Sequence, residues 1–524
     1  MPSRARTPSE LSQQLVPLLL LGIGLVATNN SVTYLDREAA SLGLAAGPLG
    51  TALPPFFSSA GATGRPPLFE ILLHFWLRGT GGNFDYFRIL SLCFFFAGIF
   101  LSGRVGRVLA GPSAGAAVIW VGVLWPLGFH YGRLATADSL AFFLVAGLTL
   151  AYLHCLEQAT TSRWAVFLIF AVCLVWTSYF GWAILACLAV DQLVRWRAKE
   201  PAATPKAILA TAALVCVGFV PLLGAFRTTV SNSLNLHQRP LSILLGAAFH
   251  LFSLLVSESI APWYWRLSLP AAVAALACVV LVVWWLPSVP RRLLYYSAAL
   301  IAVLAVAGAL QMKDLFLLSP WILLPAGIAV DAAKPRWGNF ALAAALLAVA
   351  GIGWYGVYAR RYYSALQFVE PWADVASEAT AKVGGGAKVI SDQPSFLLYL
   401  TYYLRVPKEN GPWEFAGLLP DTIRHPQVFS PEGWLAAGHP TGGQTLLVRA
   451  GDDSRGNAPI DAAARQLDES CGSISSRLRV RDEGYKWKQR FFPQLHEPQW
   501  RIEIREYDCD ESDSKQIYRL PPPQ

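Results

Sequence analysis

The sequence predicts a polytopic α-helical membrane protein that ends in a small α/β domain, and its composition supports this fold class. The 524-residue chain is 54% hydrophobic and 15% charged, with a mean hydropathy of +0.41, whereas a soluble domain carries roughly 25% charged residues. Residues 1–358 hold 12 Asp and Glu, and residues 359–524 hold the other 22. We therefore predict a transmembrane domain over 1–358 and an extracytoplasmic domain over 359–524.

The membrane domain contains eleven runs long enough to be considered as spans, since a crossing needs about 20 apolar residues. The first run is too long for the apolar core of a signal peptide and no small-residue cleavage site follows it, so we expect it to be retained. Residues 163–194 fit either one long helix or a tight pair. Residues 240–265 carry prolines and polar interruptions, which indicate an interfacial or re-entrant segment. The predicted spans are 12–29, 88–103, 112–129, 136–155, 163–177, 179–194, 207–225, 268–286, 293–311, 315–332 and 338–358.

The basic residues agree with this map. If the N-terminus is cytoplasmic, the inner segments hold thirteen Lys and Arg, and the loops 30–87 and 226–267 and the tail lie outside. The sequence therefore predicts a multi-pass protein of the plasma or inner membrane, with a cytoplasmic N-terminus and an extracytoplasmic C-terminal domain. The net charge of +8 is then explained by topology. Membrane lipids are the expected neighbours, and nothing indicates a nucleic-acid partner.

Acidic residues gather on the predicted outer face. Ionisable groups at or inside a bilayer are costly and usually mark a functional cavity. Asp36 and Glu38 stand out, since they lie two residues apart in "NNSVTYLDREAASLG", directly after the first span. They predict an external site, although a solvated loop start is the simpler alternative. The seven outer acids are Asp36, Glu38, Glu70, Asp85, Asp138, Glu258 and Asp314.

The order of several short motifs resembles the GT-C superfamily of integral-membrane glycosyltransferases, in particular the protein O-mannosyltransferase and aminoarabinose-transferase group. The first span is followed by "DRE", then by "PPL" (66–68), "RILS" (88–91) and "RLATADSL" (133–140). The late segment "KDLFLLSPWILLPAGI" (313–328) is similar to the late span of that family. The tail from 371 to 404 looks like the small extracytoplasmic domain of many members.

The resemblance implies a sugar donor carried on polyprenyl phosphate and an inverting transfer to an acceptor hydroxyl or phosphate. A carboxylate suffices as general base for a hydroxyl, and Asp36 matches the acid that the family places there. Glu38 would position the acceptor. Paired carboxylates are also ligands for hard divalent cations, so Mg²⁺ or Mn²⁺ at Asp36 and Glu38 remains open.

A lipid-phosphate leaving group calls for cationic side chains. The candidates on the predicted outer side are Arg65, Arg133, Arg266 and Lys313. Asp138 either caps the fourth span or belongs to the donor site. Arg133 could instead be an interfacial snorkelling residue, and Lys313 could pair with Asp314. Gly64 stands where one branch has a carboxylate, so the acceptor, whether protein, lipid or glycan, stays open.

Two other functional classes compete with a glycosyltransferase. A transporter or flippase would show inverted repeats and ionisable groups near the bilayer midplane, whereas here no halves match and the acids fall at span ends. A scaffold that binds glycans through its tail would tolerate alanine at Asp36.

The tail predicts strands at "AKVISD", "QTLLVRA" and "WRIEIREYD" and helices at "ADVASEATAKV", at "SFLLYLTYYL" and from residue 459. Cys471 and Cys509 are its only cysteines. They could form a disulfide if the tail lies outside the cytoplasm.

Overall fold

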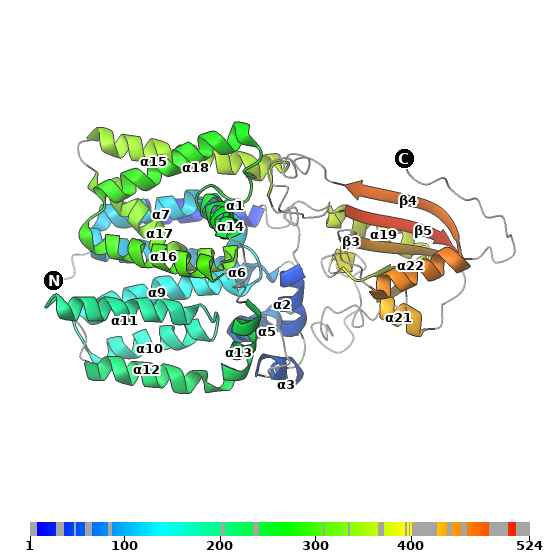
Figure 1. Cartoon of the computed structure of the whole chain (residues 1–524), viewed down its shortest axis with the longest axis horizontal. Coiled ribbons are helices and arrows are strands. Elements are labelled where there is room, and N and C mark those ends of the chain that lie inside the picture. Colours follow the sequence, from blue (N-terminus) through cyan, green and yellow to red (C-terminus); the bar gives the residue numbers. More distant parts are fainter. Residues whose placement is uncertain are drawn as a thin grey trace. The chain divides into compact units, whose positions relative to one another are not determined.

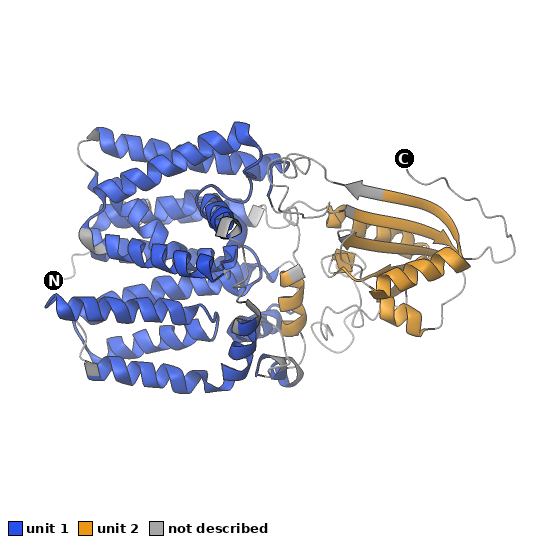
Figure 2. Cartoon of the chain, viewed as in Figure 1, with its two compact units in different colours: residues 1–32, 48–365 blue, residues 33–47, 366–524 orange. Residues whose placement is uncertain are grey.

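The computed structural model places the chain in two compact units (Figure 1, Figure 2). Unit 1 comprises residues 1–32 and 48–365, and unit 2 comprises residues 33–47 and 366–524. The structure describes residues 8–27, 36–46, 49–57, 65–81, 86–200, 205–233, 240–307, 310–333, 336–364, 371–393, 396–397, 399–400, 427–437, 443–451, 458–480 and 501–509.

Unit 1 is helical. Its longer helices are α1 (Pro8–Ala27), α6 (Ile89–Ala110), α7 (Pro112–Leu124), α9 (Ala137–Glu157), α10 (Thr161–Val175), α11 (Gly181–Arg197), α12 (Pro205–Phe219), α14 (Pro240–Val256), α15 (Trp265–Trp285), α16 (Ser288–Val306), α17 (Met312–Ala332) and α18 (Arg336–Ala359). Its shorter helices are α3 (Leu49–Ala52), α4 (Pro54–Phe57), α5 (Leu68–Gly79), α8 (Pro126–Tyr131), η3 (Val220–Leu222) and α13 (Leu223–Ser233).

A helix overlaps each of the eleven predicted spans, so the polytopic helical prediction is confirmed. Within the described ranges six helices are long and apolar enough to cross a membrane, and four shorter apolar helices accompany them. The number of eleven crossings is therefore not confirmed. Residues 163–194 form a tight pair, α10 and α11, and residues 240–256 form the apolar helix α14.

Helices α9 and α17 form the centre of unit 1, since 72% of the apolar window of each is buried. Close approach of backbones packs α17 against α7: a Cβ on Gly327 would lie 2.5 Å from the Val118 Cα. Lipid tails are as apolar as leucine, so membrane helices associate largely through such close packing of small residues. Phe316 of α17 lies at the centre of an aromatic cluster that includes Phe95, Phe142 and Trp125, with ring centroids 5.4–6.1 Å from its own.

Exposed tryptophans and tyrosines mark the two ends of unit 1. Trp284 closes α15 and Trp337 opens α18 at one end, and Trp265 and Tyr358 lie on the same two helices at the other. Aromatic residues concentrate at both membrane–water interfaces. The aromatic residues near the ends of α15 and α18 therefore lie where the interfaces are expected for helices of membrane-crossing length.

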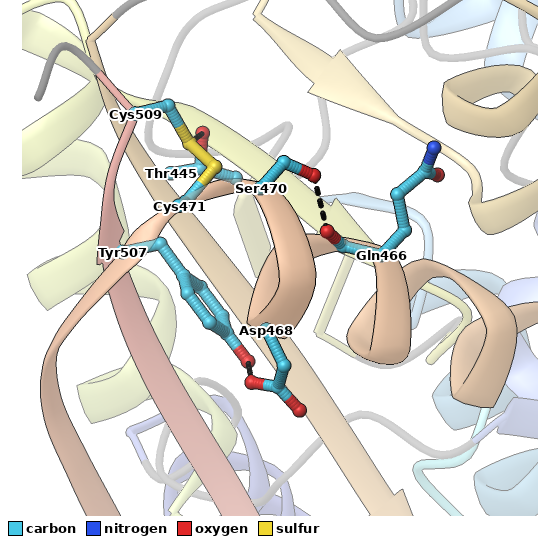
Figure 3. The surroundings of a disulfide bond; sticks show 7 residues. All are labelled: Thr445, Gln466, Asp468, Ser470, Cys471, Tyr507 and Cys509. Atoms are coloured by element: carbon cyan, nitrogen blue, oxygen red, sulfur yellow. Dashed lines mark hydrogen bonds between the residues drawn. A yellow bond between two sulfur atoms is a disulfide. The ribbon is translucent and has the colours of Figure 1, made fainter. Parts of the chain in front are cut away.

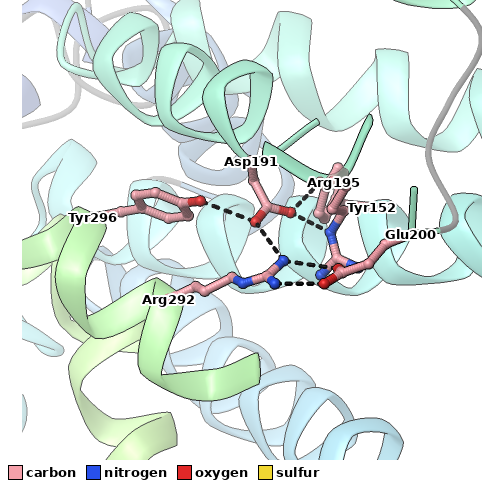
Figure 4. A network of polar contacts seen from close by, with 6 residues as sticks. All are labelled: Tyr152, Asp191, Arg195, Glu200, Arg292 and Tyr296. Carbon is pink, nitrogen blue, oxygen red and sulfur yellow. Dashed lines mark hydrogen bonds and ion pairs between the residues drawn. The ribbon is translucent and has the colours of Figure 1, made fainter. Parts of the chain in front are cut away.

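A balanced ionic network holds α9, α11 and α16 together at the end marked by Trp284 (Figure 4). Buried Asp191 accepts hydrogen bonds from two tyrosine hydroxyls, at 2.5 and 3.0 Å, and from Arg195 Nε at 2.6 Å. Arg292 donates twice to Glu200, at 2.6 and 2.9 Å. Two arginines thus face two carboxylates, so burial leaves no net charge. The members are Tyr152, Asp191, Arg195, Glu200, Arg292 and Tyr296.

Unit 2 is a five-stranded sheet with helices. The strand order is β2-β1-β3-β5-β4; β1 runs parallel to β2 and β3, and β5 runs antiparallel to β3 and β4. The strands are β1 (Lys388–Ser391), β2 (Val428–Phe429), β3 (Gln444–Gly451), β4 (Gly472–Val480) and β5 (Arg501–Asp508), and the helices are α2 (Asp36–Ala46), α19 (Trp372–Gly384), α21 (Pro431–Ala436) and α22 (Ala458–Ser470).

The small α/β fold predicted for the tail is confirmed, including three strands and the helices α19 and α22. Strand β4 was not predicted, because "GSISSRLRV" is mostly polar. The expected helix "SFLLYLTYYL" lies mostly outside the described residues. Cys471 and Cys509 form a disulfide that joins the residue before β4 to the residue after β5, next to the buried Tyr507 (Figure 3).

Candidate functional site

The predicted catalytic acids open helix α2. Asp36 is its first residue and Glu38 lies in its first turn, where negative charge is favoured by the helix dipole. The side chain of Asp36 lies outside the described residues. Glu38 has 0% exposure, so it is not the solvated residue that the simpler alternative expected. Because α2 is grouped with unit 2, the acids and the predicted cations belong to different units.

Arg65 and Glu70 form an ion pair where α5 begins. Arg65 Nη2 lies 3.0 Å from Glu70 Oε1, and the Glu70 side chain is 3% exposed. An amphipathic helix, α5, follows "PPL"; it starts at Leu68 with Pro67 as its N-cap. Arg65 is itself partly exposed, so its charge reaches the surface although one acid already balances it.

Residues 128–139, which we call the outer segment after the topology predicted from the sequence, run from α8 into the first turn of α9 and carry two predicted site residues. Eleven of the twelve residues are buried, and Asp138 alone is partly exposed. Thr136, not Asp138, is the N-cap of α9. The Thr136 hydroxyl donates to Asp138 Oδ2 at 2.8 Å. The outer segment therefore holds one accessible carboxylate in a fixed position.

Arg133 is fully buried within the outer segment. Its Nε donates to the Phe129 carbonyl at 3.0 Å, and its Cζ lies 3.7 Å from the centre of the Phe129 ring. In this conformation Arg133 has no surface for a ligand, although its charge acts on the neighbourhood. The exposed cations among the candidates are Arg266, which lies 5.6 Å from the Trp265 ring centre, and Lys313 in the first turn of α17.

Two hydrogen-bonded pairs support the outer segment. Tyr131 donates to Glu258 Oε2 at 3.1 Å, and Tyr363 Oη lies 2.6 Å from His130 Nε2. Burial, and then the charges of Arg133 and a neighbouring arginine, lower the pKa of His130 to about 3. The imidazole is therefore neutral at physiological pH.

The structure thus brings Arg133 together with residues that the sequence did not select. Glu258 was recognised only as one of the outer acids, and His130 was not among the candidate residues. Tyr363 gave no local signal, because it contacts His130 across 233 positions of the chain. An acid flanked by serines in an apolar run, as in "VSESI", was the signal available for Glu258.

An apolar cavity of about 460 Å³ lies among α7, α14, α15, α17 and α18. Apart from Ser319 its lining side chains are hydrophobic. Its lining includes Pro126 at the start of α8 and Leu255, three residues before Glu258. The cavity therefore adjoins the parts of the chain that lead into the outer segment and to Glu258. Its lining includes Trp120, Trp125, Leu254, Cys278, Ser319 and Ala326.

The part of the chain that the structure describes shows no group of ligands for a metal ion. There, no three His, Cys, Asp or Glu side chains are grouped to hold one. The Asp36 side chain is not among the described residues, so the Mg²⁺ or Mn²⁺ suggested for Asp36 and Glu38 stays a prediction.

This combination of a helical unit with a small α/β unit is also found in solved structures. The chain is similar to crystal structures of ArnT from Cupriavidus metallidurans. With the apo structure it shares 13% identity and a TM-score of 0.51, covering 95% of this chain and 98% of that chain. With the structure bound to undecaprenyl phosphate it shares 12% identity and a TM-score of 0.51, covering 94% and 98%. At these identities the likeness shows the fold. No protein-family model matches the sequence, and no relative was found among curated proteins.

Proposed function

We propose that this chain is an inverting membrane glycosyltransferase that moves a sugar from a polyprenyl-phosphate carrier to an acceptor hydroxyl or phosphate. The observation that carries the proposal is the fold shared with ArnT over nearly the whole of both chains, since one of those structures is bound to undecaprenyl phosphate. The apolar cavity supports it, because its hydrophobic lining suits the hydrocarbon chain of such a carrier.

In the proposed reaction Asp36 is the general base. Its carboxylate takes the proton of the acceptor hydroxyl, the acceptor oxygen attacks the anomeric carbon, and the bond from that carbon to the phosphate oxygen breaks. The electron pair leaves with the phosphate, which needs no added proton. A single displacement inverts the anomeric configuration. Glu38, two residues further along α2, positions the acceptor.

The leaving phosphate gathers negative charge as the bond breaks, and preorganised cations stabilise it. We assign direct contact to Arg65, Arg266 and Lys313, whose side chains reach the surface. Arg133 contributes its charge from inside the outer segment. Asp138, which is partly exposed in the same segment, suits recognition of donor hydroxyl groups.

The proposed topology places the site outside the cytoplasm. The basic residues Arg195 and Arg292 lie at the end of unit 1 opposite Trp265, and positive residues favour the cytoplasmic side. A disulfide in unit 2 suits an oxidising compartment. Both features support a cytoplasmic N-terminus and an extracytoplasmic unit 2.

The test compares Asp36→Asn with wild type in a label-transfer assay, using a panel of radiolabelled polyprenyl-phosphate sugars and membrane extract as acceptor. The proposal predicts transfer by wild type and a loss of at least about 10²-fold in Asp36→Asn, the lower range for general-base catalysis. The matched control is Glu157→Gln, a 54% exposed carboxylate at the predicted inner end, which should keep wild-type activity. Equal activity of Asp36→Asn and wild type would remove Asp36 as the base.

A further inference from the structure

We propose that Glu258 is a positioning residue: through Tyr131 it holds the outer segment, with Arg133 and Asp138, in the geometry that transfer requires. The proposal rests on the proposed function and assigns a role within the same site. Glu258 touches no reacting atom in this account; it acts through the phenol that it binds.

The backbone before Glu258 is strained. Ser257 has φ 109°, a region that non-glycine residues rarely adopt. Such strain persists only where its surroundings enforce it. Here the Ser257 N–H donates to Ser253 O at 2.8 Å, and the Ser259 hydroxyl donates to Gly353 O at 2.8 Å. The turn after α14 is thereby fixed to α18 and directs Glu258 into the interior.

Glu258 joins three parts of unit 1. Its carboxylate accepts from Tyr131 of α8 at 3.1 Å, and its carbonyl accepts from both the N–H and the hydroxyl of Ser364, at 2.9 and 3.0 Å. Ser364 follows Tyr363, which is bonded to His130 of α8 at 2.6 Å. The turn after α14, the chain leaving α18 and α8 therefore form a closed set of hydrogen bonds.

The outer segment transmits this restraint to the candidate site residues. The Ser139 hydroxyl donates to Gly132 O at 3.0 Å, so the first turn of α9 is tied to the end of α8. Arg133 lies between these two residues in the chain, and the Thr136 hydroxyl donates to Asp138 at 2.8 Å. Because almost every residue here is buried, a displaced Tyr131 shifts its neighbours instead of moving into solvent.

The expected effect follows from this geometry. A misplacement of about 1 Å in a residue remote from the chemistry can lower the rate about 10²-fold. Glu258→Ala leaves the Tyr131 hydroxyl without its acceptor, so kcat should fall about 10- to 100-fold. Glu258→Gln keeps an acceptor oxygen but loses the charge, so it should restore most of kcat. Agreement between Glu258→Gln and Glu258→Ala would mean that charge, not positioning, is the role, and would overturn the proposal.

The experiment uses the full chain in lipid nanodiscs with the donor that wild type consumes. We compare Glu258→Ala, Glu258→Gln, Tyr131→Phe and the Glu258→Ala/Tyr131→Phe double variant. We expect Glu258→Ala and Tyr131→Phe to lower kcat by similar factors, and the double variant to lose no more kcat than either single variant. KM for the donor should change little. Multiplicative losses, or wild-type kcat in Glu258→Ala, would overturn it. If Glu258→Ala does not fold, the kcat values of Tyr131→Phe and Glu258→Gln still test the positioning role.

Hydrogen exchange of residues 128–139 gives a readout that needs no activity. Tyr131→Phe should speed exchange there and leave strand β5 unchanged. If exchange responds in this way and wild type transfers no sugar from any donor, the proposed function fails while the restraint on the outer segment stands. If wild type is active and neither exchange nor kcat responds, the positioning role fails alone.

Discussion

Removing the Cys471–Cys509 disulfide should destabilise unit 2 by about 4 kcal/mol. The bridge spans a sequence separation of 38, and a closed loop of that length removes about 13 cal/mol/K of unfolded-chain entropy, or about 4 kcal/mol at 25 °C. In the folded state it fixes the start of β4 beside the end of β5, where Tyr507 also binds Asp468 at 2.7 Å. For a domain of this size the loss lowers Tm by roughly 8–16 °C.

The assay follows thermal unfolding of the full chain in nanodiscs, with hydrogen exchange of β5 reporting on unit 2. Wild type is compared with the Cys471→Ala/Cys509→Ala variant and with wild type under reductant. The matched control replaces Cys93 and Cys216, which are exposed and unbridged. A Tm shift below about 2 °C in the bridge variant would refute the loop-entropy argument. A similar loss in the control would refute its assignment to this bridge.

Three further perturbations probe unit 1. Asp191→Ala leaves the partly buried Arg195 without its main partner, so it should lower the free energy of unfolding by about 3 kcal/mol, with Asp191→Asn milder. Equal stability of Asp191→Ala and wild type would contradict the network's role. Ala326→Trp should fill the apolar cavity and slow sugar transfer from long-chain donors more than from short-chain donors, whereas Ala210→Trp at an exposed position should not have this effect. If donor chain length makes no difference, the cavity does not hold the hydrocarbon chain of the donor. The pKa of His130 in the folded state, about 3, lies below its unfolded value, so unit 1 should lose stability as pH falls from about 6.5 towards 3. His130→Gln should lessen that loss of stability, and an unchanged pH profile would contradict the burial of neutral His130.

The sequence was most informative where one local pattern decides the structure. Apolar runs predicted the longer helices of unit 1 except α14, and the runs "QTLLVRA" and "WRIEIREYD" predicted β3 and β5. It was least informative where a polar strand gains its place only from a partner. β4 pairs with β5 along its length, with Arg477 opposite Ile504, and nothing in its own pattern indicated a strand.

The candidate site shows the same division. The position of Asp36 and Glu38 after the first span, and of Asp138 at the start of the fourth, could be read from local order. The proposed role of Glu258 depends on its hydrogen bond with Tyr131, which lies 127 positions away in the chain. Arg133 was selected for its charge, but the sequence could not show that it would stack on Phe129 beneath the surface. Long-range contacts between short polar segments leave no periodic trace.

A mass balance on the lipid carrier tests directly whether this chain is a glycosyltransferase. Purified wild type in nanodiscs is given a polyprenyl-phosphate sugar labelled in both the sugar and the lipid, together with membrane extract. The account predicts that free polyprenyl phosphate appears in the same amount as sugar on a new acceptor, with inverted anomeric configuration. Recovery of the intact donor for every sugar tested, or its movement across the membrane unchanged in a vesicle assay, would contradict a glycosyltransferase and favour a transporter.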